Sequence, residues 1–229
     1  MLGKFYVVAT PIGNLEDITL RALRILKEVD IVLCEDTRTT RVLLNKYEIV
    51  TRCESYHSHS KESKVEKIKE WLEEGKNLAL VSDAGTPCIS DPGVALIAEL
   101  RASLEDVQII AVPGATAFTA LVSIAGVYAD KYTFHGFVPH KKGRQTLIKE
   151  ILNSKNTVDI VYESSHRIVK LLEEIAEVEK DLSISKRITI GRELTKFFEE
   201  VIQGTATNVL ETIKGDSNKQ KGEFVVMIS

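Results

Sequence analysis

Short apolar runs recur along the first half of the chain, at residues 5–9, 31–33, 78–81 and 107–111. Each run is almost uninterrupted, which is typical of a strand buried on both faces of a sheet. Between them lie stretches in which apolar residues return at helical spacing, as over residues 15–26. This alternation of strand and helix patterns predicts a mainly parallel sheet.

The second half has a different rhythm of apolar and polar positions. Strand patterns at residues 185–192 and 197–203 follow each other directly, and a further one covers residues 223–228. Successive strands without a crossover helix imply antiparallel pairing. We therefore predict two α/β domains, residues 1–112 with a mainly parallel sheet and residues 113–229 with a mixed sheet.

Turn-rich loops follow three of the apolar runs in the first half. The longest, residues 81–93, holds two prolines and two glycines. It exceeds the ~2–6 residues of an ordinary βα connection, which is the alternative interpretation. Residues 10–14 and 112–117 share its Pro-Gly character. Because open α/β sheets bind ligands at the carboxyl ends of their strands, these loops predict one binding site.

Composition narrows the class of protein. The 229 residues are 44% hydrophobic and 28% charged, ordinary values for a soluble globular protein. No apolar run approaches the ~20 residues of a membrane span, and residues 1–4 do not resemble a signal peptide. Cys34, Cys53 and Cys88 lack metal-ligand spacing, so we expect a reduced, cytoplasmic compartment and no metal site. The formal net charge of −3 argues against indiscriminate nucleic-acid binding.

Long loop and strand-end motifs, spread over the whole chain, carry a family resemblance. On these motifs the chain resembles the tetrapyrrole methylase superfamily, and within it the ribosomal RNA small subunit methyltransferase I family. The matching segments are residues 9–15, 34–38, 55–57, 82–93, 112–117, 134–139, 162–168, 191–196 and 221–224.

The resemblance implies S-adenosylmethionine as methyl donor, bound between the two domains, and a homodimer. The sequence has no glycine-rich dinucleotide fingerprint and no P-loop, which weakens hydride and phosphoryl transfer as alternatives. Asp83 is expected to face a donor hydroxyl or amine, although a turn cap is an alternative. The donor-binding residues expected from the resemblance and the loops are Pro11, Ile12, Gly13, Asp83, Gly85, Thr86, Pro113, Thr116, Ala117, Tyr162 and Leu194.

The implied acceptor is the ribose 2′-hydroxyl of a cytidine in small-subunit (16S) ribosomal RNA. A ribose hydroxyl is a very weak acid, so its proton must pass to a base. Glu35 and Asp36 end a buried strand beside the expected site and are the candidates, while a structural ion-pair network with Arg38 is the alternative. His57 and His59 are better explained as loop residues than as metal ligands.

Basic residues near the site are the expected RNA contacts: Arg38, Lys141, Lys142, Arg144, Arg167 and Arg192. Lys141, Lys142 and Arg144 form the densest cluster, for which a solvated turn is the alternative. The chain departs from the family pattern at Ser165, where proline is expected, and at Gln203, where arginine is expected. Two other functions stay open, a small-molecule methylase for a tetrapyrrole and a non-catalytic sensor of S-adenosylmethionine.

Overall fold

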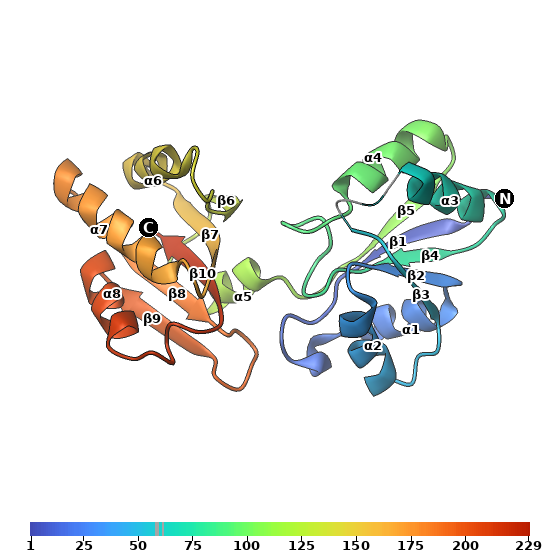
Figure 1. The fold of residues 1–229 in the computed structure, drawn as a ribbon, viewed down its shortest axis with the longest axis horizontal. Coiled ribbons are helices and arrows are strands. Elements are labelled where there is room, and N and C mark those ends of the chain that lie inside the picture. Colours follow the sequence, from blue (N-terminus) through green and yellow to red (C-terminus); the bar gives the residue numbers. More distant parts are fainter. Residues whose placement is uncertain (58–59, 61) are drawn as a thin grey trace. The chain divides into compact units, whose positions relative to one another are not determined.

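The structure is a computed structural model that describes residues 1–57, 60 and 62–229, so His59 lies outside the described residues. The chain forms two compact units, Met1–Thr116 and Ala117–Ser229 (Figure 1). The boundary therefore follows Thr116, whereas the sequence placed it after Val112. Each unit has a five-stranded sheet of its own.

The first unit is built on a parallel sheet with the strand order β3-β2-β4-β1-β5. This confirms the parallel arrangement expected from the apolar runs. The strands are β1 (Lys4–Val8), β2 (Ile31–Cys34), β3 (Arg52–Ser55), β4 (Leu78–Leu80) and β5 (Gln108–Val112).

Helices cover both faces of this sheet, with α1 and α2 on one side and α3 and α4 on the other (Figure 1). Successive residues of β2 alternate between the two cores: Val32 and Cys34 pack with α1 and α2, Ile31 and Leu33 with α3 and α4. Two buried faces explain the uninterrupted hydrophobicity of these strands. The helical segments are η1 (Leu15–Asp17), α1 (Leu20–Glu28), α2 (Thr37–Lys46), α3 (Glu62–Glu73) and α4 (Val94–Ser103).

The second unit is built on a mixed sheet with the order β6-β7-β10-β8-β9. Only β6 and β7 are parallel, and the other three neighbouring pairs are antiparallel, as the sequence predicted. Its elements are α5 (Ala117–Ile124), β6 (Tyr132–Phe137), α6 (Arg144–Asn153), β7 (Val158–Ser164), α7 (Ile168–Leu182), β8 (Ile188–Arg192), β9 (Glu200–Gly204), α8 (Ala206–Lys214) and β10 (Glu223–Ile228).

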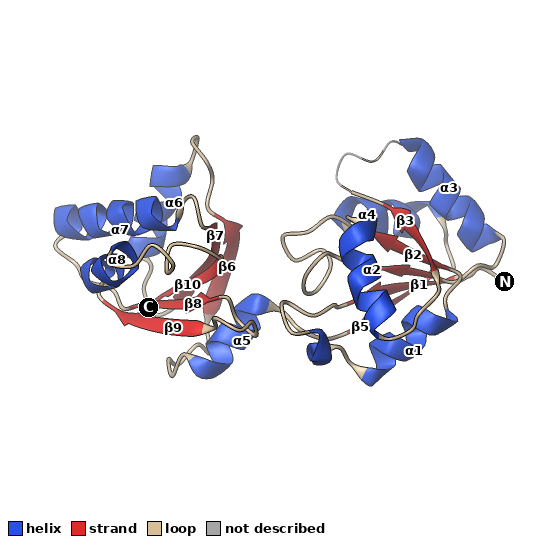
Figure 2. Cartoon of the chain, turned by 60° about the horizontal axis from the view of Figure 1, so that its bottom comes forward, coloured by secondary structure: helices blue, strands red, loops and turns tan. Residues whose placement is uncertain are grey.

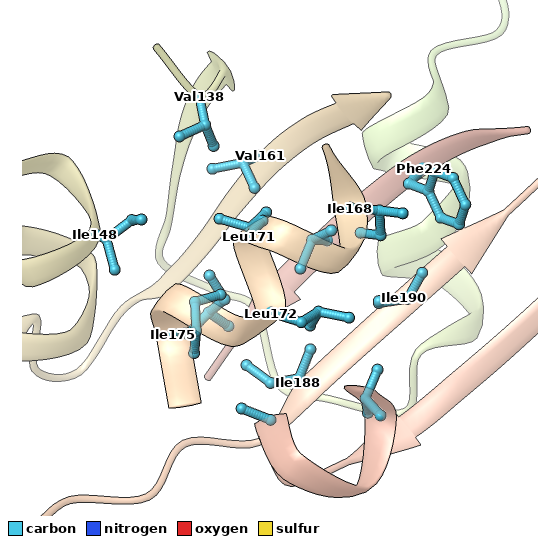
Figure 3. Packing of buried hydrophobic residues seen from close by; sticks show 14 of the residues in the cluster. Val138, Ile148, Val161, Ile168, Leu171, Leu172, Ile175, Ile188, Ile190 and Phe224 are labelled. Carbon is cyan, nitrogen blue, oxygen red and sulfur yellow. The ribbon is translucent and has the colours of Figure 1, made fainter. Parts of the chain in front are cut away.

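Helices α6, α7 and α8 share one face of the second sheet. Figure 3 shows Leu172 of α7 beside Ile188 and Ile190 of β8 in this core. Helix α5 lies on the opposite face (Figure 2). A Cβ at Gly191 would stand 2.9 Å from Leu121 of α5, so glycine permits this close approach. None of the helices that the structure describes is both long and apolar enough to cross a membrane.

Candidate active site at the carboxyl edge of the first sheet

The loops after β1 and β4 are joined by paired backbone hydrogen bonds. The amide of Thr10 donates to the carbonyl of Gly85 at 2.8 Å, and the amide of Gly85 donates to the carbonyl of Thr10 at 3.1 Å. The Thr10 hydroxyl also donates to the carbonyl of Ser82 at 3.1 Å. Gly85 has a φ of 87°, and a Cβ there would stand 3.2 Å from Ile12 Cγ2. This position therefore favours glycine on both conformational and steric grounds.

The loop after β4 is also joined to the loop after β5. The Thr86 hydroxyl donates to the carbonyl of Ala115 at 3.0 Å and lies 2.7 Å from the hydroxyl of Thr116. Nearby, a Cβ on Gly114 would stand only 2.9 Å from the Cβ of Ala9 at the end of β1. The three turn-rich loops thus meet at one edge of the sheet, as their positions in the sequence indicated.

The expected donor residues of the first unit are gathered at this edge with different degrees of burial. Pro11, Ile12 and Gly85 are buried, Thr86 and Thr116 are half-buried, and Gly13, Asp83 and Pro113 are exposed. Exposed Asp83 and Gly13 leave a carboxylate and a backbone segment accessible on a rigid base of buried neighbours.

The remaining expected donor residues, Ala117, Tyr162 and Leu194, belong to the second unit. The Tyr162 hydroxyl accepts from the amide of Phe118 at 3.4 Å, directly after Ala117. Its ring meets that of Phe134 edge-on at 4.9 Å between centroids. This aromatic group around Tyr162 was missed by the sequence analysis, because its members come from three separate elements, β6, β7 and α5.

Asp36 has a structural task. Its carboxylate accepts from the amide of Arg38 at 2.8 Å and caps the start of α2. The Arg38 guanidinium approaches the same carboxylate to 2.6 Å. These hydrogen bonds from Arg38 lower the pKa of Asp36 to about 2. A carboxylate with so low a pKa is a weak base, so the ion-pair alternative describes Asp36 better than a catalytic role.

The pKa values of Glu35 and Asp91 are shifted in the opposite direction to that of Asp36. Burial raises the pKa of Glu35, and the negative charge of Asp83 raises it further. Burial also raises the pKa of Asp91 to about 6, helped by the charges of Glu35 and Asp83 and opposed by a hydrogen bond from Ser82. Asp91 was not singled out from the sequence, although it lies in the long loop of residues 81–93. Carboxyl groups with pKa values pushed apart in one place are typical of functional sites.

The sequence of the chain matches the model of a known protein family. A model described as Tetrapyrrole (Corrin/Porphyrin) Methylases matches residues 4–210. The chain belongs to this family. It is thus a member of a methyltransferase family, as the loop motifs indicated.

Curated relatives refine the placement within the tetrapyrrole methylases. A Thermotoga maritima protein named ribosomal RNA small subunit methyltransferase I is 40% identical over 228 residues, which cover 100% of this chain and 99% of that protein. Proteins of the same name from Escherichia coli O157:H7 and Bacillus subtilis are 41% and 42% identical, cover 99% of this chain, and are themselves covered to 77% and 75%. The resemblance to this subfamily is confirmed.

Solved structures show the same fold at much lower identity. A cobalt precorrin-4 methyltransferase of cobalamin biosynthesis has a TM-score of 0.70 at 18% identity, covering 99% of this chain and 94% of its own. A uroporphyrin-III-C-methyltransferase from Thermus thermophilus has a TM-score of 0.64 at 17% identity, covering 100% and 93%. These likenesses establish the tetrapyrrole methylase fold of two α/β units.

The basic cluster after β6 differs from its sequence prediction. Lys141 and Lys142 are exposed, but Arg144 is buried, with 4% of its surface accessible. Its guanidinium donates to Glu174 at 2.6 Å and lies 3.4 Å from Glu163. The prediction of one exposed cluster of three cations is therefore wrong for Arg144.

Arg167 and Arg192 are likewise used inside the fold. Arg167 pairs with Glu163 at 2.7 Å and donates to the carbonyl of Val138 at 2.8 Å. Arg192 is 8% exposed and donates to three backbone carbonyls. Of the arginines expected to contact RNA, only Arg38 is exposed, and it is paired with Asp36.

The two departures from the family pattern both have structural partners. The Ser165 hydroxyl donates to the carbonyl of Gly222 at 2.7 Å and accepts from the amide of Gly222 at 2.9 Å. Gln203 accepts from Arg187 at 2.6 Å and donates to the carbonyl of Ala125 at 2.6 Å. Serine therefore fixes its loop by hydrogen bonds where proline would do so through its ring.

Proposed function

We propose that the chain transfers a methyl group from S-adenosylmethionine to the 2′-hydroxyl of a cytidine ribose in small-subunit ribosomal RNA. The observation that carries the proposal is the identity of about two residues in five with relatives of that name, over the full chain. The tetrapyrrole enzymes share the fold at 17–18% identity. Identity this low supports the architecture of the chain but gives no reason to assign it their tetrapyrrole substrates.

The residues at the edge of the first sheet fit the donor chemically. S-Adenosylmethionine supplies a methyl group on a positively charged sulfur and carries an ammonium, a carboxylate and an adenine. The exposed Asp83 carboxylate suits the ammonium or a ribose hydroxyl. Glycine at positions 85 and 114 lets the loops pack closely against Ile12 and Ala9, which brings the exposed backbone of Gly13 and Pro113 to the same edge of the sheet as Asp83. Ala117, Tyr162 and Leu194 of the second unit remain proposed contacts.

Glu35 is the proposed base. Its pKa is raised by burial and by Asp83, so it accepts a proton more readily than a solvent-exposed glutamate does. Asp36 positions the start of α2 instead, since Arg38 occupies its carboxylate. We therefore propose that Glu35 receives the ribose proton and that Asp36 holds the neighbouring helix in place.

Exposed Lys141 and Lys142 are the proposed phosphate contacts, because both ammonium groups are accessible. Such a substrate also agrees with a cytoplasmic location.

A homodimer is proposed on the strength of the family and is checked by sedimentation at micromolar concentration, where a fully active monomer would refute it.

Methyl transfer to unmethylated small ribosomal subunits tests the proposed reaction. Labelled methyl groups should enter the RNA, and the modified nucleotide should resist alkaline cleavage, because a methylated 2′-oxygen cannot attack its phosphate. Asp83→Ala should weaken donor binding, while Asp17→Ala, an exposed acid of η1, serves as the matched control. Glu35→Gln should slow transfer with donor affinity unchanged. Label entering a tetrapyrrole in place of RNA would refute the proposal.

A further inference from the structure

Two neighbouring phenylalanines between β8 and β9 are exposed. Phe197 is 94% exposed and Phe198 is 66% exposed. Their rings meet edge-on, with centroids 5.0 Å apart and planes at 90°. Large apolar side chains displayed together in this way often mark a binding surface.

The loop that carries these rings, residues 193–199, is held in a defined conformation. Glu193 and Thr195 have φ values of 49° and 64°, a region that side-chain-bearing residues adopt only when their surroundings enforce it. Lys196 donates to Glu193 and to Glu223 of β10, each at 2.9 Å. The amide of Thr195 donates to Glu199 at 2.5 Å.

Buried Arg192 anchors the same loop from below. One of its guanidinium nitrogens donates to the carbonyl of Phe198 at 3.1 Å, and the others donate to the carbonyls of Asn218 and Lys221 at 2.7 and 2.8 Å. Leu194, on the same loop, is 6% exposed. The aromatic rings thus stand on a rigid support, and strain at a rigid loop is a reason to look for function.

The size of the patch favours a single flat group over a protein surface. Two phenylalanine side chains bury roughly 150–250 Å² each, whereas a stable protein interface needs about 800 Å² from each partner. Charged residues Lys196, Glu199 and Glu200 flank the two phenylalanines in the sequence, and the cores of protein interfaces are poor in charge. Unpaired RNA bases, in contrast, are commonly stacked on one or two aromatic rings.

We propose that the ring of Phe197, braced edge-on by that of Phe198, forms a stacking platform for an unpaired base of the RNA substrate. The inference rests on the proposed function, since it assigns one contact to that RNA. It gives a role to the motif of residues 191–196, which leads into the platform from buried β8.

Three substitutions of Phe197 test the platform against unmethylated small ribosomal subunits and against oligocytidylate. Phe197→Ala and Phe197→Leu should each weaken binding by about ten-fold, while Phe197→Trp should bind as the parent does. The slope of log affinity against log salt should stay unchanged, because stacking releases few counterions. Thermal unfolding should be unaffected in all three variants, since the side chain is exposed.

Tyr128→Ala is the matched control, because Tyr128 is 96% exposed in another loop of the same unit. It should bind both RNAs as the parent does. Equal losses in Tyr128→Ala and Phe197→Ala, parental binding by Phe197→Leu, or a dimer that dissociates on Phe197→Ala would each overturn the platform. A parent that methylates no subunits would instead refute the proposed function. Methylation by the parent with full RNA binding by Phe197→Ala would refute the platform alone.

Discussion

Two aspartates at the edge of the first sheet show how far the same side chain is changed by its surroundings. Hydrogen bonds from Arg38 hold the pKa of Asp36 at about 2, and burial raises that of Asp91 to about 6. The first carboxylate is stabilised in its charged form, and the second is destabilised in it. The first therefore organises a helix start, whereas the second is poised to titrate close to neutral pH.

The raised pKa of Asp91 predicts a pH dependence of stability. Its folded value of about 6 exceeds the ordinary value of 3.8, so folding favours the protonated form. The charged form destabilises the fold above that pKa, and the penalty disappears as the pH falls towards the ordinary value. Asp91→Asn should raise the free energy of unfolding by about 1–2 kcal/mol near neutral pH, allowing for partial exposure. Denaturant titrations at several pH values measure the free energy of unfolding of the parent and the variant. If the variant remains more stable than the parent by the same amount in acid, the raised pKa of Asp91 does not explain the difference.

The roles of charged residues were harder to predict from the sequence in the second unit than in the first. Arg144 follows Lys141 and Lys142 so closely that the three form one basic cluster in the sequence. Its partners, Glu163 and Glu174, lie 19 and 30 residues further along the chain. No local sequence pattern predicts a pairing over this distance, so the burial of Arg144 could be recognised only in the tertiary structure.

At the scale of elements, local patterns were sufficient for much of the site. The strands of the first sheet are short, β2 and β4 are fully buried, and turn residues directly follow β1, β4 and β5. A parallel sheet brings such loops to one edge wherever its strands are placed in the order. The hydrogen bonds that join the loops could not be predicted from the sequence, because they depend on distances between the loops. The raised pKa of Asp91 could not be predicted for the same reason.

The contact between the ends of β1 and β5 predicts a steric coupling. Gly114→Ala would bring its Cβ to 2.9 Å from the Cβ of Ala9, too short for two methyl groups. We expect a loss of about 1–3 kcal/mol in the free energy of unfolding. Ala9→Gly removes the opposing methyl, so the double variant should recover about 1 kcal/mol relative to additive behaviour. Denaturant titration of all four proteins measures the coupling, and strictly additive changes would show that the loops separate without strain.

The loop before α6 predicts a salt effect on RNA binding. If exposed Lys141 and Lys142 each contact a phosphate, their joint replacement by alanine should lower the slope of log affinity against log salt by roughly one unit per contact. Arg144 is left in place, because its substitution would remove a buried cation that pairs with both Glu163 and Glu174 and would destabilise the fold. The double variant Lys27→Ala, Lys46→Ala removes two exposed lysines of the first unit as the control. Equal slopes for the parent and the Lys141/Lys142 variant would leave this loop as a solvated turn.

At the scale of the molecule, each unit has its own hydrophobic core. The cores of the first unit are formed by residues of the first unit alone, and Leu172, Ile190 and Phe224 belong to a core made wholly of the second. The change in rhythm along the sequence indicated this division. Its position was less certain, because residues 113–116 have the composition of a loop and carry no apolar periodicity that assigns them to either side.

Separate cores predict that damage to one unit leaves the unfolding of the other unchanged. Trp71, the single tryptophan, is 6% exposed in a core of the first unit, so its fluorescence reports that unit. Leu172→Ala removes a fully buried side chain from the second core and should destabilise that unit by about 2–5 kcal/mol.

In a denaturant titration of Leu172→Ala, circular dichroism should show part of the helical signal lost at lower denaturant, while the fluorescence midpoint of Trp71 stays where it is in the parent. Ile68→Ala, in the same core as Trp71, is the converse control and should move the fluorescence midpoint. A fluorescence midpoint that follows the Leu172 substitution by the full amount would show that the two cores unfold as one cooperative structure, and the energetic independence argued from their composition would fail.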